Sequence, residues 1–353
     1  MGIRNMGWNE WLQLDSDYKK TYSIRLRRTN DQGELATGTL PGFRPQAMES
    51  LSEMCSYLAA KYPDLFKVTR ASYDAAIPES YGDSLVGDEG GAVRTIQNMI
   101  TGDFWDFDEL DKIDSGWNPM RIAGLLQQDD LGLMIEGSNG EYYLQGGSIC
   151  TAGFWRLEDK LGRSMDEIHT HGVVPGWKNK LKFSMERFFQ KMKVDKPVER
   201  NNYFFQIDDQ VDWSTKTNGP ETIFDQGAKA PVPELLSESS DPSWQAPVPT
   251  TDPTEVWFRT ERQALRRMPK TGCILITIRT YFHRVADIAT EPGVPGRMAS
   301  AIRSWPEEVA KYKGGDLYTP VLLPYLDDLH AKQLAAGEAM LEAVDADSEK
   351  YPF

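Results

Sequence analysis

The chain has 353 residues, a hydrophobic fraction of 40% and a formal net charge of −14. This apolar content is enough for a sizeable core and argues against wholesale disorder. The acidic balance argues against general nucleic-acid binding, because an acidic surface repels phosphate backbones. No apolar run approaches the roughly 20 residues of a membrane span, and no targeting segment is recognisable. We therefore expect a soluble, cytoplasmic protein.

The cysteine content excludes several classes of site. Cys55, Cys150 and Cys273 are too few, and odd in number, for a disulfide framework. The chain contains no CxxC pair and no CxxCH motif, which excludes a zinc ribbon and covalent c-type heme.

The N-terminal half predicts one long helix and one hairpin. Apolar residues recur at helical spacing over 46–62, and Pro63 ends the pattern. Residues 80–118 are rich in Gly, Asp and Asn and are expected to form loops with one short helix. Residues 131–136 alternate in polarity, a Ser-Asn-Gly turn follows, and 142–149 return as a strand.

The centre of the chain predicts an amphipathic helix over 179–193 and a strand over 203–207. Residues 209–254 are polar and contain seven prolines, so they are expected to form a long loop or insertion. The apolar face of the helix is predicted to consist of Leu181, Met185, Phe188, Phe189 and Met192.

Two further strands are predicted at 256–260 and 273–282, joined through a turn at 268–272. In the second strand, Cys273, Leu275, Thr277, Arg279 and Tyr281 are expected on one face and Ile274, Ile276 and Ile278 on the other. Helices are predicted around 298–312 and 327–344. Strands that cluster in hairpins, with helices between them, indicate an α+β fold with an antiparallel sheet.

Several cofactor motifs are absent from the sequence. It contains no GxGxxG after a strand, no P-loop, no HExxH and no GxSxG. The chain is therefore not expected to bind NAD(P)H in a standard way, and redox chemistry would need a prosthetic group or a partner.

His169 and His171 lie just before the amphipathic helix. Neutral imidazole is a common iron ligand. We expect the pair to lie in an extended segment, with one histidine binding iron while the other faces solvent. The alternative is a pair that caps a loop or is solvated.

Arginines dominate two other segments. Arg259, Arg262 and Arg266 lie in a block with Glu261, and bidentate arginine contacts suit carboxylates such as heme propionates. Arg279 interrupts an apolar strand, where an unpaired charge is too costly, so it must face a partner or a polar cavity. For both segments, structural salt bridges are the alternative.

Ordered blocks across residues 8–315 resemble the heme-dependent oxidative N-demethylase α-subunit family. They are Trp11–Tyr18, Trp155–Arg163 with Ile168-His169 and Val174-Pro175, Phe258–Pro269, Ile276–Tyr281 and Tyr312–Gly314. The resemblance implies an α+β, PAS-like heme domain, in which an antiparallel sheet has helices over one face. It also implies helical extensions at both ends, with divisions at 1–65, 66–315 and 316–353.

The resemblance implies that heme b activates dioxygen and oxidises a small methylamine. It also implies a partner reductase that carries FMN and a 2Fe-2S cluster and takes electrons from NADPH. The heme iron would be ligated by His169, with His171 as the alternative because the block carries extra residues there. Arg259, Arg262 and Arg266 are predicted to bind the cofactor. Arg279, Tyr281 and Glu261 are predicted to be catalytic, with Arg279 in a distal pocket or at a propionate.

Three other functions are compatible with the sequence. They are a heme-PAS gas or redox sensor, a biosynthetic heme oxygenase that acts on a larger metabolite, and a heme-free interaction protein. The chain shows no kinase, cyclase or DNA-binding output module, which argues against the sensor.

Overall fold

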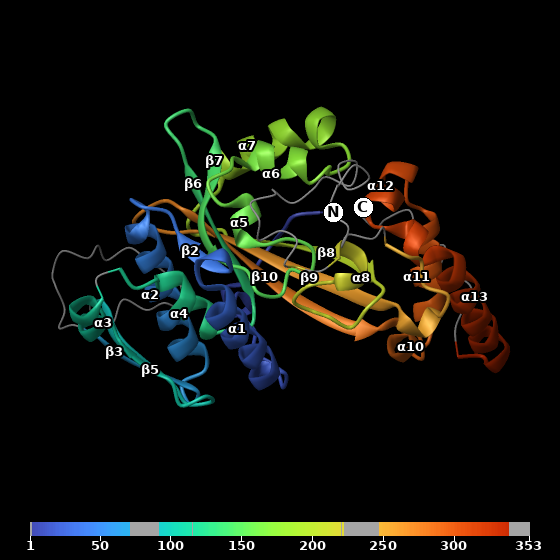
Figure 1. Ribbon diagram of the computed structural model, residues 1–353, viewed down its shortest axis with the longest axis horizontal. Coiled ribbons are helices and arrows are strands. Elements are labelled where there is room, and N and C mark those ends of the chain that lie inside the picture. Colours follow the sequence, from blue (N-terminus) through green and yellow to red (C-terminus); the bar gives the residue numbers. More distant parts are fainter. Residues whose placement is uncertain (1, 71–91, 115, 220, 222–246, 339–353) are drawn as a thin grey trace.

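The computed structural model describes residues 2–70, 92–114, 116–219, 221 and 247–338, and it contains two antiparallel sheets (Figure 1). The larger sheet has seven strands in the order β1-β8-β9-β10-β6-β7-β2. These strands are β1 (Arg4–Asn5), β8 (Val198–Gln206), β9 (Trp257–Arg267), β10 (Ile274–Arg284), β6 (Asp130–Glu136), β7 (Tyr142–Ser148) and β2 (Thr37–Thr39). The smaller sheet consists of β3 (Phe66–Arg70), β4 (Val93–Asn98) and β5 (Phe104–Asp106).

Alternation along the central strands gives the large sheet two distinct faces. Ile274 packs with the helices that follow β7, whereas the adjacent Leu275 packs with those of the N-terminal region. The first face is covered by α5 (Leu157–Lys160), α6 (Met165–His171), the π-helix η3 (Trp177–Leu181) and α7 (Lys182–Lys191). We call it the α6 face. Of these helices, α6 and α7 lie at the top of Figure 1.

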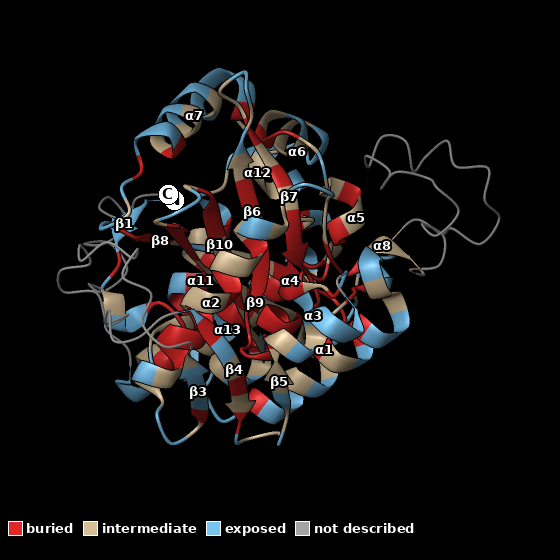
Figure 2. Ribbon diagram, turned by 90° about the vertical axis from the view of Figure 1, so that its left-hand side faces the viewer, coloured by how far each residue is buried: buried red, intermediate tan, exposed pale blue. Residues whose placement is uncertain are grey.

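The opposite face is covered in two places. At one end, α2 (Arg44–Lys61) and α4 (Pro119–Leu125) pack on β6, β9 and β10. At the other end, α11 (Val294–Arg303) and α13 (Thr319–Ala336) pack on Phe205 and Phe258. The buried apolar residues form three clusters under these layers, while α7 shows exposed residues on its outer side (Figure 2).

The remaining helical elements connect these layers. They are η1 (Trp8–Glu10), α1 (Tyr18–Gln32), η2 (Gly33–Leu35), α3 (Phe107–Ile113), α8 (Thr215–Asn218), η5 (Pro253–Glu255), α10 (Val285–Ile288), α12 (Glu307–Tyr312) and η6 (Gly315–Leu317). Among the described helices, none combines the length and the apolar character needed to cross a bilayer.

The α+β class, the antiparallel sheet, the 131–149 hairpin, the 46–62 helix and the 268–272 turn are confirmed. The prediction that residues 80–118 are loops with one short helix was wrong in its described part, because β4 and β5 lie there beside α3. The predicted strands at 203–207 and 256–260 were too short, because charged residues continue the pleat on half-open faces of β8 and β9.

Three predicted helices were also misplaced. The 179–193 helix is interrupted, since it begins as the π-helix η3, and Leu181 is 40% exposed and not part of an apolar face. The 298–312 helix divides into α11 and α12 before Pro306, whose ring cannot sit inside a helix. The described part of the 327–344 helix belongs to α13, which begins earlier, at Thr319, and ends at Ala336. Residues 339–344 of that prediction, and residues 220 and 222–246 of the predicted insertion, lie outside the described residues.

Candidate functional site

His169 lies near the C-terminal end of α6, whose start is fixed by a capping box. The Ser164 hydroxyl accepts a hydrogen bond from the Glu167 amide at 3.2 Å, and the Glu167 carboxylate accepts one from the Ser164 amide at 2.8 Å. This exchange satisfies two amides at the helix start. The prediction of an extended His169–His171 segment was wrong, because the capped helix continues through both residues.

The imidazole of His169 is held on two sides. Its Nδ1 lies 2.7 Å from the Met165 carbonyl oxygen, and its ring stacks on Trp177 with 4.0 Å between centroids and 12° between planes. A carbonyl can only accept, so Nδ1 carries the proton and Nε2 carries the lone pair. Within the described part of the chain, Nε2 has no hydrogen-bond partner. Trp177 is itself fixed by a 2.7 Å hydrogen bond to Asp166.

Burial keeps this imidazole neutral. It lowers the pKa of His169 from 6.5 to about 4, and the nearby charges of Lys160 and Arg200 act in the same direction. A neutral imidazole with one fixed N–H and one open lone pair is the form that binds a metal. His171 differs, because it is exposed and its Nδ1 accepts a 3.1 Å hydrogen bond from Arg163.

The α6 face is incompletely covered along the middle of the sheet. On β10, Ile276 and Ile278 are half-buried, although Leu275 and Thr277 on the opposite face are fully buried. Central strands of a sheet are normally covered on both faces when helices pack there. The α6 face therefore exposes an apolar band beside polar side chains. Its half-buried residues on β8, β9 and β10 include Arg200, Asn202, Phe204, Gln263, Ile276, Ile278 and Thr280.

Three cations surround one carboxylate on the α6 face. Burial lowers the pKa of Lys160 to about 8, that of Lys313 to about 8, and that of Arg200 as well, and in each case Glu261 partly offsets the effect. Glu261 is 7% exposed and accepts a 2.9 Å hydrogen bond from Gln263. The cluster carries more positive than negative charge, which suits an anionic ligand.

The two lysines reach this cluster over aromatic rings. Lys160 Nζ lies 3.7 Å from the ring centroid of Trp155. Lys313 Nζ lies 4.3 Å from the ring centroid of Tyr203 and donates a hydrogen bond to the Tyr203 carbonyl. No ion pair joins either lysine to a carboxylate within the residues described.

Arg259 also faces the α6 side but is fully buried and bound by the protein. It donates to the carbonyls of Thr151 and Val211 at 2.6 and 2.7 Å and to the Gln206 side chain at 3.1 Å. A Cβ at Gly153, where φ is +76°, would lie 2.5 Å from Arg259 Nη2. Arg259 therefore connects the sheet to the two loops that contain Thr151 and Val211.

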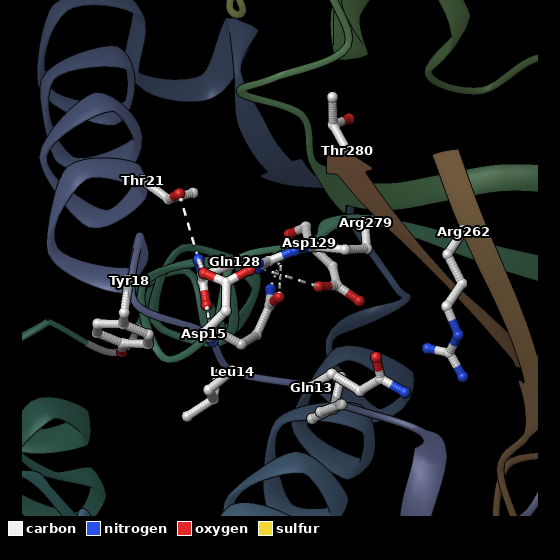
Figure 3. Close-up of polar contacts among 12 residues, drawn as sticks. Gln13, Leu14, Asp15, Tyr18, Thr21, Gln128, Asp129, Arg262, Arg279 and Thr280 are labelled. Carbon is white, nitrogen blue, oxygen red and sulfur yellow. Dashed lines mark hydrogen bonds and ion pairs between the residues drawn. The ribbon is translucent and has the colours of Figure 1, made fainter. Parts of the chain in front are cut away.

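Arg279 lies on the opposite face of the sheet from His169. It pairs across the strands with Arg262, whereas the adjacent Thr280 pairs with Glu261 on the α6 face. Figure 3 shows Arg279 reaching toward Asp15 and Asp129. Its guanidinium forms an ion pair with Asp15 and lies 5.4 Å from the centroid of Tyr281.

Asp129 lies beside Arg279 and has a raised pKa. Burial raises its pKa to about 6, although Arg279 and Arg262 oppose the shift. Its Oδ1 lies 3.9 Å from Arg279 Nη1, and neither atom has a hydrogen-bond partner within the described residues. Gln128 anchors the neighbouring Asp15, with its side-chain amide 2.9 Å from that carboxylate.

Arg262 and Arg266 hold the N-terminal segment on this opposite face. Arg262 donates to the carbonyls of Glu10 and Trp11 at 2.6 and 3.1 Å. Arg266 pairs with Glu53 at 2.5 Å and covers the ring of Trp11 at 4.5 Å.

A hollow of about 320 Å³ is separate from the residues around Glu261 and from those around Arg279, because none of them lines it. Its walls come from α1, α4 and the β4–β5 hairpin, and they include Tyr22, Trp105 and Trp117. None of the residues predicted from the sequence to be functional lines it.

A comparison with known families assigns these regions together to one family. Residues 2–323 match a family described as Haem-dependent oxidative N-demethylase, alpha subunit-like. The chain belongs to this family. The match includes both faces of the large sheet and the resemblance blocks quoted from the sequence.

In this N-demethylase-like chain, the predicted site residues divide between two faces. His169, Glu261 and Arg259 lie on the α6 face, whereas Arg262, Arg266, Arg279 and Tyr281 lie on the other. The structure therefore does not bring the predicted distal arginine and the predicted iron ligand onto one face.

Sequence reasoning missed Lys160, Arg200, Lys313 and Trp177 as candidate site residues. Lys160 and Lys313 lie inside the blocks that carry the family resemblance, which is a usable signal. Arg200 gives no such signal until β8 is known to extend back to Val198.

Proposed function

We propose that the chain is the heme-binding subunit of an oxygen-activating oxidoreductase, in which His169 would hold the heme iron through Nε2. The observation that carries this proposal is the anchored neutral imidazole, whose Nδ1–H faces the Met165 carbonyl and whose Nε2 has no partner among the described residues. Metal-bound histidines commonly donate their other N–H to a carbonyl in this way. His171 fits less well, because Arg163 occupies its Nδ1 and the ring is exposed.

The residues around His169 fit a porphyrin. The half-buried Ile276 and Ile278 offer an apolar surface, while Lys160, Lys313 and Arg200 offer positive charge. Heme b has two propionates, and we assign these three cations to hold them, because Lys and Arg bind carboxylates by charge and hydrogen bonding. Arg259 is assigned to support this wall, since its N–H groups are already bound to the protein.

When bound, heme b supplies the oxygen activation that no side chain of this chain supplies. The chain's own contribution is positioning and charge. Trp177 and the Met165 carbonyl orient the ligand ring. Glu261 supplies the negative charge of the cluster, and we assign it to contact a protonated methylamine. The catalytic roles predicted for Arg279 and Tyr281 would require an effect through the sheet, because both face away from His169.

We propose oxidative N-demethylation of a small methylamine as the reaction, with electrons from a partner reductase that carries FMN and a 2Fe-2S cluster and oxidises NADPH. The family description, which names an alpha subunit, supports a partner.

The test is formaldehyde release from dimethylamine by the heme-loaded chain, with dioxygen and a flavin and iron–sulfur reductase supplied with NADPH. We expect formaldehyde and methylamine in equal amounts, and Glu261→Gln is expected to take up heme normally but to turn over amine at least tenfold more slowly. Normal heme uptake without amine-dependent oxygen consumption would contradict the reaction while leaving heme binding intact.

A further inference from the structure

The segment from His171 to Lys196 has the opposite charge to the rest of the molecule. It contains seven Lys or Arg residues and two Asp or Glu residues, in a chain whose net charge is −14. All of it is described, and it forms the end of α6, the π-helix η3, α7 and the turn beyond. A local cationic surface on an acidic protein attracts anionic partners to one place.

The outer side of α7 combines these charges with an exposed aromatic ring. On α7, Phe183, Arg187 and Lys191 are spaced four residues apart, which places them along one face of the helix, and Lys180 precedes them in η3. All four are exposed, and Phe183 is 76% exposed. We call this surface the α7 basic face. Figure 2 shows exposed residues along the outer side of α7.

No residue that the structure describes neutralises the charges of the α7 basic face. Lys182, on the inner side, pairs with Asp166 at 2.5 Å and faces Glu186 at 3.8 Å. By contrast, Lys180, Arg187 and Lys191 have no ion-pair partner in the part of the chain that the structure describes. Unpaired cations around one exposed ring have the composition of an interface rim around an aromatic anchor.

The α7 basic face is continuous with the His169 site. Trp177, which stacks on His169, is the first residue of η3, and η3 leads directly into α7. Val173, in the connection between α6 and η3, is 52% exposed and has φ of +49°, a conformation that is strained for a β-branched residue. Exposed strained residues of this kind cluster at functional surfaces.

We propose that the α7 basic face is the docking surface for an acidic electron-transfer protein that delivers electrons to the His169 site. This inference rests on the proposed function, because it assigns the docked protein to the reduction of heme. The docking itself requires no heme. Charge complementarity favours an acidic protein. A membrane surface is disfavoured, because the remainder of this acidic chain would be repelled by anionic lipid.

The test uses an acidic plant-type [2Fe–2S] ferredoxin as the probe and the full chain with and without heme. The variant Lys180→Glu/Arg187→Glu/Lys191→Glu is expected to weaken ferredoxin binding at least tenfold at low ionic strength, as measured by calorimetry. The difference should shrink in high salt, because exposed charges are screened. Phe183→Ala is expected to weaken binding severalfold at both salt concentrations, since its contribution is apolar.

The matched control is Lys19→Glu/Lys20→Glu/Lys270→Glu, which makes the same charge change at exposed lysines elsewhere. It should bind ferredoxin within about twofold of wild type if the effect is local. In heme-loaded protein, the α7 variant should slow heme reduction by ferredoxin but not by reduced methyl viologen.

Two results would overturn the docking surface. One is equal loss of ferredoxin binding in both triple variants, and the other is tighter binding of wild type to phosphatidylserine vesicles than to ferredoxin. Failure of heme uptake with normal ferredoxin binding would instead count against the proposed function alone.

Discussion

The protonation of His169 should control the stability of the heme-free chain in mild acid. Burial lowers its folded-state pKa from 6.5 to about 4, so between these values the unfolded chain binds a proton that the folded chain does not. Stability from this group is therefore complete above about pH 6.5 and declines as the pH falls toward 4. Between pH 7 and pH 4.5, these two pKa values correspond to a loss of about 2.5 kcal/mol.

The assay is urea unfolding of the heme-free chain at pH 7 and pH 4.5, compared with His169→Gln. Glutamine does not titrate, so the variant should lose about 2.5 kcal/mol less than wild type on acidification. His171→Gln is the control, because that ring is exposed. If wild type and His169→Gln lost the same free energy of unfolding, burial would not be holding this imidazole neutral.

Three further predictions concern the same site. Trp177→Leu removes the ring stacked on His169 and should release heme to apomyoglobin several times faster, and an unchanged rate would refute the positioning role. Lys160→Met with Lys313→Met should weaken heme binding about tenfold, or ~1.4 kcal/mol, through lost propionate contacts. The same pair should leave binding of heme dimethyl ester unchanged, and equal losses for both ligands would contradict the assignment. Ser164→Ala should cost about 1 kcal/mol in urea unfolding through the lost helix cap, whereas no change would show that the cap contributes nothing.

The sequence predicted most of the sheet because its strands obey simple periodicities. The alternation of Leu275 and Thr277 with Ile276 and Ile278 placed β10 correctly, and the apolar spacing over 46–62 placed α2. β8 and β9 were shortened in the prediction because their α6 face carries charged residues. Side chains such as Arg200 and Glu261 break the usual pattern of a strand where the sheet is only half covered.

Several residues of the candidate site were selected from the sequence, but their arrangement could not be predicted. His169 was selected through its sequence block, yet its helix was missed even though Ser164 and Glu167 form a recognisable capping pattern. Arg262 and Arg279 were grouped with His169, because sequence spacing does not reveal which face of a sheet each residue occupies. That assignment depends on which helices pack on each face, and these contacts are set by tertiary structure.

The central claim is that Nε2 of His169 binds porphyrin iron. The most direct measurement is the visible absorption spectrum of the chain titrated with hemin, compared with His169→Ala and His171→Ala. We predict a sharp Soret band with six- or five-coordinate histidine character for wild type and His171→Ala, and its loss or shift in His169→Ala, with recovery on adding imidazole. An unchanged spectrum in His169→Ala, or a wild-type chain that takes up no hemin, would contradict the account.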